Sequence, residues 1–414
     1  MKFRIYTFGC KTNQYDSESL RRILINSMEE ARDKDIPDII IVNTCSVTHI
    51  AERKARTLIR HLMKTYPNAR IIVTGCYAER DPKSIEGLGN LIVIGNKEKE
   101  SIPRLFLSDL KPKILPEDKS KRIRAFVKIQ DGCDDFCSYC IVPYVRGPVR
   151  SRNTEEILDE IKTLVDLGYP EIVLTGIHIG RFEDNGKRLP DLVKLIYKEI
   201  PTIKRIRLSS IEPQEVDREI IELFNEVPNL CPHIHLVAQS GSDKVLKDMK
   251  RKYTREEYLS LVRAFRAVRG DIEFTTDIIV GFPTEEEDDF RDTLSLIEEV
   301  GFIKVHIFPF SPRPGTKAFD LKQIDRKIVK EREERVKEVS LEVASNRFKH
   351  LIGENVEILV ERYANNIAVG LTPSYVRVYS DTDFPVSVGS LLKVYVNSLE
   401  REKDSIILRG KAST

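Results

Sequence analysis

The stretch KIQDGCDDFCSYCIVPYVRGPVRSR, residues 128–152, places Cys133, Cys137 and Cys140 in a C-x3-C-x2-C pattern directly after a strand-like run. Structural zinc usually has four ligands and C-x2-C pairs, so three thiolates without a local fourth ligand suit zinc poorly. Thiolates also select iron-sulfur clusters, and a 4Fe-4S cluster held by three cysteines keeps one iron open for a substrate or cofactor. The pattern therefore predicts an iron-sulfur site on one loop.

This loop begins a region in which strand-like and helical stretches alternate. The strand-like runs end near six positions, Gln130, Gly176, Ser210, Gln239, Gly281 and Pro309. Six such repeats predict a barrel-like parallel sheet, complete or partial. Polar residues gather at the expected strand ends, namely Thr175, His178, Ser209, Ser210, Glu212, Gln239, Asp277 and Ser311. In barrels of this class these ends form the active-site face.

Residues 1–110 also alternate between short β-branched runs and helical stretches, which predicts a second parallel α/β sheet. Cys10, Cys45 and Cys76 each follow such a run by one to three residues. Because parallel strands present their carboxyl ends at one edge of a sheet, the three cysteines are expected to meet there. The alternative is that each is a small buried side chain, as free cysteines often are.

Residues 111–122 and the chain from residue 322 onward lack this alternation of strands and helices. Residues 111–122 are polar and unpatterned, as in an interdomain linker, and residues 322–350 read as one long charged helix. After Gly353 five short strand-like runs follow, which predict a small antiparallel β-barrel of the OB type. Such a barrel is often a nucleic-acid module, and a structural cap is the alternative.

The composition limits the possible classes. The chain has 414 residues, of which 41% are hydrophobic and 32% charged. No apolar run approaches the roughly 18 to 20 residues that cross a bilayer, and the start alternates like a strand rather than a signal peptide. We therefore expect a cytoplasmic protein without membrane segments. An odd number of cysteines, seven, favours metal or catalytic thiols over disulfides and leaves Cys231 as structural.

The net charge of the whole chain is only +2, although its front half is basic. Six cations lie close in sequence to the cysteines of residues 128–152, namely Lys121, Arg122, Arg124, Arg146, Arg150 and Arg152. They are predicted to contribute to a phosphate-binding surface, although charge runs are usually solvated faces.

The cysteine loop resembles that of radical S-adenosylmethionine (SAM) enzymes, in which the open iron binds SAM and its reduction yields a 5'-deoxyadenosyl radical. By this resemblance Tyr139, before the third cysteine, lies near the adenine of SAM. The resemblance also makes four strand-end residues candidates for binding SAM, namely Gly176, Ser209, Glu212 and Gln239. A strand-end serine or glutamate can equally be a helix cap.

Further segments resemble the methylthiotransferase family over nearly the whole chain. They are FGCKTNQYDSE, NTCSVT and TGCYAE near the amino terminus, and SSIEP, QSGSDKVLKDMKRKYT, TDIIVGFPTEEEDDF and FSPRPGT in the centre. The family implies an amino-terminal domain (1–112), a radical SAM partial barrel (119–348) and a TRAM domain (351–414). The stretch Met28 to Pro37 is shorter than usual in this family, which puts one amino-terminal strand in doubt.

The resemblance also implies the chemistry. Cys133, Cys137 and Cys140 would hold the SAM-cleaving 4Fe-4S cluster, and Cys10, Cys45 and Cys76 an auxiliary 4Fe-4S cluster whose open iron carries a sulfur. One SAM would supply the methyl group and a second the radical, with electrons from a flavodoxin or ferredoxin and sulfur from a separate source.

The segments GCKTNQ, KIQDGC and IVPYVRGPVRSR look most like the members that modify carbon 2 of N6-threonylcarbamoyladenosine at position 37 of tRNA. Methylthiolation of an aspartate of a small-subunit ribosomal protein is the alternative within the family. A zinc-stabilised RNA-binding protein without catalytic activity is a more remote alternative.

Overall fold

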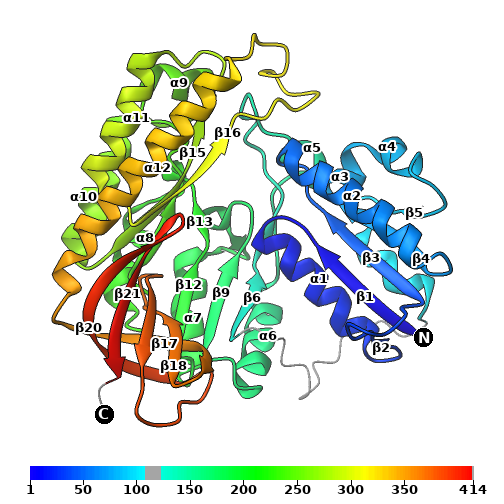
Figure 1. The fold of residues 1–414 in the computed structure, drawn as a ribbon, viewed down its shortest axis with the longest axis horizontal. Helices are drawn as coiled ribbons and strands as arrows, with labels where there is room; N and C mark the ends of the chain where they lie inside the picture. Colours follow the sequence, from blue (N-terminus) through cyan, green and yellow to red (C-terminus); the bar gives the residue numbers. More distant parts are fainter. Residues whose placement is uncertain (108–122, 413–414) are drawn as a thin grey trace.

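The computed structural model describes residues 1–107 and 123–412, so the predicted linker lies outside the described residues. Figure 1 shows an amino-terminal sheet, a central set of strands surrounded by helices, and a small carboxy-terminal barrel. In the described part, no helix combines the length and the apolar character that crossing a membrane requires.

The amino-terminal sheet is parallel throughout, with strand order β2-β1-β3-β4-β5. Its strands are β1 (Lys2–Thr7), β2 (Glu29–Glu30), β3 (Ile39–Thr44), β4 (Arg70–Gly75) and β5 (Ile92–Val93). The helical segments are α1 (Lys11–Leu24), α2 (His49–Thr65), α3 (Cys76–Arg80), α4 (Pro82–Glu86) and the 3-10 helix η1 (Lys99–Leu105). The predicted parallel sheet is confirmed, and the strand in doubt is present as β2, with only two residues.

Strand β3 shows why this sheet forms. Its sequence IIIVNT is buried at every position, as expected for a central parallel strand covered on both faces. Alternate side chains point to opposite faces, so Ile40 packs in one cluster with Ala55 of α2 and Ile41 in another with Leu20 of α1. The strand ends of this sheet are therefore held rigidly from both sides.

The central region is a partial barrel of parallel strands. One sheet has the order β12-β9-β6 and a second the order β13-β14-β15-β16. The strands are β6 (Arg124–Lys128), β9 (Glu171–Thr175), β12 (Arg205–Leu208), β13 (Ser210–Ile211), β14 (His233–Leu236), β15 (Glu273–Val280) and β16 (Lys304–Pro309). A bridge between Ile206 and Leu230 connects the sheets, and no pairing of β16 with β6 closes the ring within the described ranges. The predicted barrel is thus confirmed in its partial form.

Helices cover the outside of this partial barrel (Figure 1). They are α6 (Thr154–Asp166), α7 (Leu189–Glu199), α8 (Arg218–Glu226), α9 (Asp243–Asp248), α10 (Arg255–Val268) and α11 (Glu287–Val300). Shorter elements join them, namely α5 (Val142–Arg146), η2 (Ile179–Arg181), η3 (Pro213–Glu215), η4 (Lys349–Leu351), and the strand pairs β7 (Gln130–Asp131) with β8 (Arg150–Ser151) and β10 (Glu183–Asp184) with β11 (Lys187–Arg188). The alternation of strands and helices predicted for this region is therefore confirmed.

Helix α12 (Arg326–Phe348) connects the partial barrel to the closed carboxy-terminal barrel. Leu341, Ala344 and Phe348 of this helix join the core of the small barrel, whereas Ile328 near its amino end is exposed. The five strands are those predicted, β17 (Asn355–Ala364), β18 (Ile367–Leu371), β19 (Arg377–Asp381), β20 (Leu391–Glu402) and β21 (Ser405–Ala412).

The prediction that this barrel is antiparallel is wrong for one pair, because β19 and β21 run parallel. The other four pairs are antiparallel. A closed ring with an odd number of strands cannot alternate direction all the way round, so at least one neighbouring pair must be parallel.

Candidate functional site

The loop with Cys133, Cys137 and Cys140 leaves the carboxyl end of β6 and is fixed at both ends. Its base is closed by the pairing of β7 with β8, and the Cys133 N–H donates to the Gly147 carbonyl at 2.9 Å. In its middle, Ser138 donates from its N–H to the Met249 carbonyl at 3.0 Å and from its hydroxyl to the Asp248 carbonyl at 2.7 Å. These bonds hold the three cysteines against the end of α9.

The three thiols lie close enough to influence one another electrostatically. Burial raises the pKa of Cys140 to about 12 and that of Cys133 to about 11, and the neighbouring cysteines add to both shifts. Thiols alone would therefore stay protonated here at neutral pH. A cationic metal centre favours the thiolate form, so this set of three cysteines, the barrel trio, is chemically suited to a metal cluster.

Two side chains that sequence reasoning gave no role contact the barrel trio. His178 Nε2 lies 3.0 Å from Cys133 Sγ, and its Nδ1 contacts the buried Glu215 carboxylate. Arg251 lies 3.5 Å from Cys137 Sγ and forms an ion pair with Glu212. Hydrogen bonds to cluster sulfurs tune a cluster's reduction potential. The only sequence signal for His178 was its position after a strand.

The strand ends predicted to bind SAM carry buried polar atoms. Three buried side-chain oxygens there have no hydrogen-bond partner in the described part of the chain, Thr175 Oγ1, Ser209 Oγ and Gln239 Oε1. Gln239 also has a φ of 64°, a left-handed conformation that non-glycine residues rarely adopt. Unpartnered buried polar atoms cost free energy, so this arrangement fits a polar ligand that would satisfy them.

The remaining predicted SAM contacts have different surroundings. Glu212 is already paired with Arg251. A Cβ on Gly176 would lie 2.8 Å from the Gln130 carbonyl oxygen, so the backbone at this position has no room for a side chain. Tyr139 lines a cavity of about 130 Å³ together with Cys140, Gln239 and Asp277.

The amino-terminal cysteines, the sheet trio, follow three adjacent strands. Cys10 comes after β1, Cys45 after β3 and Cys76 at the start of α3 after β4. A Cβ added to Gly9 would lie 2.9 Å from Cys45 Sγ, which brings the backbone before Cys10 directly onto Cys45. Burial raises the pKa of Cys45 to about 12, and Cys76 and Cys10 add to the shift. The structure thus gathers the three thiols, as predicted from the strand order.

Arg146 connects the two trios. It lies at the end of α5, shortly after Cys140, and is fully buried. Its guanidinium donates to Asp131 Oδ1 at 2.8 Å and to Asn13, and its charge opposes the rise that burial causes in the pKa of Cys76. Asp16 of α1 joins the same network through Lys99 at 2.5 Å and Lys128 at 2.6 Å. Buried ion pairs therefore run from the sheet trio to the barrel loop.

This burial corrects the predicted phosphate-binding surface. Arg146 is enclosed, Arg124 pairs with Glu171 at 3.0 Å, and Arg152 pairs with Glu160 at 2.7 Å. These three guanidinium groups are therefore engaged with carboxylates of the protein. Arg150 is exposed, while Lys121 and Arg122 lie outside the described residues.

The 130 Å³ cavity is lined by Cys140 of the barrel trio and by Val47 and Thr48, which lie two and three residues after Cys45 of the sheet trio. Ser311, beyond β16, lines it as well. Arg313 holds this segment against the amino-terminal domain, because it donates to the Ser46 carbonyl at 3.2 Å and pairs with Glu52 of α2 at 3.0 Å. A substrate held in this space would contact Cys140 and the segment that follows Cys45.

Comparisons with known proteins identify relatives of the full chain. Residues 127–297 match the Radical SAM superfamily, and residues 2–95 match the Uncharacterized protein family UPF0004. The chain is 40% identical to the Threonylcarbamoyladenosine tRNA methylthiotransferase MtaB of Chlamydia pneumoniae, over 97% of this chain and 96% of that protein. It is 35% identical to the tRNA-2-methylthio-N(6)-dimethylallyladenosine synthase of Thermodesulfovibrio yellowstonii, over 96% of each.

A solved structure shares the fold. The radical S-adenosylmethionine methyltransferase TsrM from Kitasatospora setae, with cobalamin and a [4Fe-4S] cluster bound, superposes with a TM-score of 0.56 at 14% identity. The match covers 77% of this chain and 74% of that one.

Proposed function

This chain belongs to the radical SAM methylthiotransferase family, and we propose that it adds a methylthio group to carbon 2 of N6-threonylcarbamoyladenosine at position 37 of tRNA. The observation that carries the proposal is that one cavity is lined by Cys140 of the barrel trio and by Val47 and Thr48, which closely follow Cys45 of the sheet trio. One trio serves SAM cleavage and the other serves sulfur delivery. The names of the relatives with 40% and 38% identity support the choice of substrate.

In this proposal the barrel trio holds a 4Fe-4S cluster, and the sheet trio holds a second one. When bound, the first cluster supplies the electron that cleaves SAM, and the second presents a sulfur for methylation and transfer. Tyr139, Ser209 and Gln239 bind SAM, Gly176 leaves room for it, and Glu212 acts through Arg251. His178 orients Cys133 and is oriented in turn by Glu215.

We assign the amino-terminal domain to residues 1–112, the radical SAM domain to 119–348 and the RNA-binding TRAM domain to 351–414. One SAM is the methyl donor and another the radical source, and a reduced flavodoxin or ferredoxin supplies electrons. A separate sulfur source completes the reaction, which takes place with tRNA in the cytoplasm.

The test is methylthiolation by the anaerobically reconstituted protein with SAM, sulfide and a chemical reductant. Three substrates are compared by mass spectrometry, namely anticodon stem-loops with threonylcarbamoyladenosine or dimethylallyladenosine, and the ribosomal protein. We expect the methylthio increment on the threonylcarbamoyl RNA only. A product on either other substrate instead would overturn the assignment.

Metal analysis separates this proposal from the zinc alternative. Two 4Fe-4S clusters correspond to about eight irons per chain and a brown, oxygen-sensitive protein. A colourless protein with stoichiometric zinc would contradict both cluster assignments.

A further inference from the structure

Strands β15 and β16 of the partial barrel each border two neighbouring cavities. Side chains two residues apart on a strand share a face. On β16, Lys304 and His306 line a large cavity at the amino ends of the strands, whereas Phe308 lines the 130 Å³ cavity at their carboxyl ends. On β15, Thr275 lines the first cavity and Ile279 the second. We call the cavity of about 780 Å³ at the amino ends the lower cavity, and the 130 Å³ cavity at the carboxyl ends the upper cavity.

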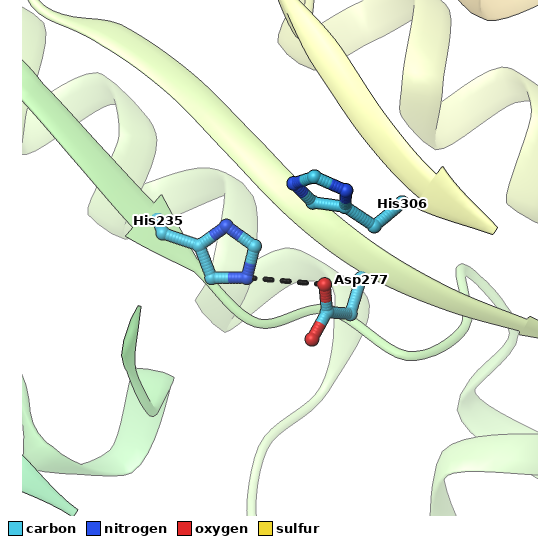
Figure 2. Close-up of side chains that lie close together, drawn as sticks. All are labelled: His235, Asp277 and His306. Carbon is cyan, nitrogen blue, oxygen red and sulfur yellow. Dashed lines mark ion pairs between the residues drawn. The ribbon is translucent and has the colours of Figure 1, made fainter. Parts of the chain in front are cut away.

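His235 and His306 line the lower cavity and Asp277 lines the upper one. Figure 2 shows that these three side chains lie close together. His235 Nε2 lies 3.3 Å from Asp277 Oδ1, and the His235 Nδ1 lies 2.9 Å from the Thr275 hydroxyl. One atom each of His235, Asp277 and His306 lies within 4.8 Å of the others. Such a set can hold a divalent metal, or it can bind an organic group that carries both an anion and hydrogen-bond donors.

The surrounding charges favour the organic group. Lys11, directly after Cys10, reaches into the lower cavity, and its ammonium lies 5.9 Å from the centre of the Tyr375 ring. Lys11 forms no ion pair within the described part of the chain. Burial alone would raise the pKa of Asp277, but His235, His306 and Lys11 hold it below its usual value. Asp277 is therefore ionised, and the Lys11 ammonium already balances its negative charge, so a divalent cation would add positive charge that no further carboxylate of the cluster offsets. Burial lowers the pKa of His306 to about 4, so His306 offers a neutral imidazole that can form hydrogen bonds.

The lower cavity as a whole is basic. Most of its charged lining residues are cations, namely Lys11, Arg124, Lys304, Arg362, Arg377 and Lys403, against Glu402 and Asp404. Arg362, Arg377 and Lys403 belong to the closed barrel, as Glu402 and Asp404 do, and Arg124 is paired with Glu171. Lys11 of α1 and Lys304 of β16 line the cavity from the other parts of the chain. An anion that entered next to Lys11 and His306 would therefore meet a complementary potential.

We propose that Lys11, His235, His306 and Asp277 form the subsite for the N6 substituent of the target adenosine, with Lys11 and His306 binding its carboxylate. This deepens the proposed function and rests on it. The threonylcarbamoyl group carries one carboxylate together with N–H and hydroxyl donors, which matches the Lys11 ammonium, the two imidazole groups and the one carboxylate acceptor, Asp277. A dimethylallyl group has no such polar atoms. With the adenine in the upper cavity, the substituent extends past Asp277 into the lower one.

The experiment measures binding of anticodon stem-loops to the reconstituted protein by fluorescence anisotropy at fixed salt. The two RNAs are identical except for threonylcarbamoyladenosine or plain adenosine at position 37. We expect the wild type to prefer the modified RNA by about tenfold, the scale of one or two charge-assisted hydrogen bonds. Lys11→Met should remove most of this preference and change binding of the plain RNA less than about twofold. The exposed Lys327 of α12 provides the matched control, Lys327→Met.

Because Lys11 adjoins Cys10, His306→Asn is tested in parallel, and both variants are checked for iron content and 5'-deoxyadenosine production. Equal loss of affinity for both RNAs would mean a phosphate contact and would overturn the subsite. Stoichiometric zinc that disappears in His306→Asn would establish the metal site instead. If the wild type methylthiolates the modified RNA but Lys11→Met and His306→Asn keep its preference, only the subsite is wrong. If the wild type modifies no such RNA, the proposed function itself fails.

Discussion

The two cysteine trios reach similar surroundings by different routes. The barrel trio lies on one loop that β7 and β8 close, so neighbouring residues already bring its thiols together. The sheet trio comes from three loops that only the parallel sheet unites, and Arg146 from the other trio's loop reinforces it. Cysteines on one loop, as in the barrel trio, therefore depend mainly on the structure of that loop. Cysteines from three loops, as in the sheet trio, depend on the tertiary structure that brings the loops together.

The largest expected effect separates the roles of the two trios. Cys133→Ala and Cys45→Ala should each lose about four irons of eight, because each breaks one three-cysteine site. Cys133→Ala should abolish 5'-deoxyadenosine formation, whereas Cys45→Ala should retain it and lose the methylthio product. Iron analysis and chromatography of both products provide the measurement. If Cys133→Ala still produced 5'-deoxyadenosine, the assignment of the barrel trio would be refuted.

The next effect tests the link between the trios. Arg146→Met removes one buried partner from Asp131 and Asp16, which keep Lys128 and Lys99, so the cost in the free energy of unfolding should reach at most about 3 to 5 kcal/mol, the cost of a fully broken buried pair. Urea denaturation measures this cost. The exposed Arg150→Met is the control and should change the free energy of unfolding by no more than about 0.5 kcal/mol. The variant should also lose iron from the sheet trio before the barrel trio. Equal stability of the two variants would mean that Arg146 is not the link.

Sequence reasoning predicted the parts of this site that local patterns encode. The spacing of Cys133, Cys137 and Cys140 places them on one loop, and Cys10, Cys45 and Cys76 follow strands that are neighbours in a parallel sheet. The five strands of the closed barrel also follow from alternation and turn residues. Each of these features depends on residues near one another in sequence or on simple strand order.

The features that the sequence did not predict depend on contacts between residues far apart in sequence. Arg146 and Arg150 look alike in sequence, and only Asp131, Asp16 and Asn13 decide that one faces inward. His178 reaches Cys133 because β6 and β9 pair in register, which no local pattern encodes. The meeting of His235, Asp277 and His306 likewise requires β14, β15 and β16 to pair in register.

A smaller effect concerns pH and the support of the sheet trio. Burial alone would raise the pKa of Asp16, but Lys99, Lys128 and Arg146 lower it below its usual value. An unfolded aspartate titrates near about 3.9, so this stabilisation is present above that pH and is lost as the pH falls below it. In the apoprotein, urea midpoints should fall less steeply below about pH 4 for Asp16→Asn than for wild type. The exposed Asp166→Asn should follow the wild type, and an Asp16→Asn curve parallel to both would contradict the prediction.

The smallest effect tests whether the barrel trio works together with the strand ends beside it. Ser209 Oγ is buried without a partner in the described part of the chain, so Ser209→Ala should leave the free energy of unfolding within about 0.5 kcal/mol. Its hydroxyl is free to bind SAM, and its loss should weaken SAM binding about three- to tenfold in equilibrium dialysis. The control, Ser380→Ala in the closed barrel, removes a hydrogen bond to the Asp381 carbonyl. It should lower the free energy of unfolding by about 1 kcal/mol and leave the affinity for SAM unchanged. The opposite pattern would make Ser209 a structural residue and leave Gln239 as the main strand-end contact of SAM.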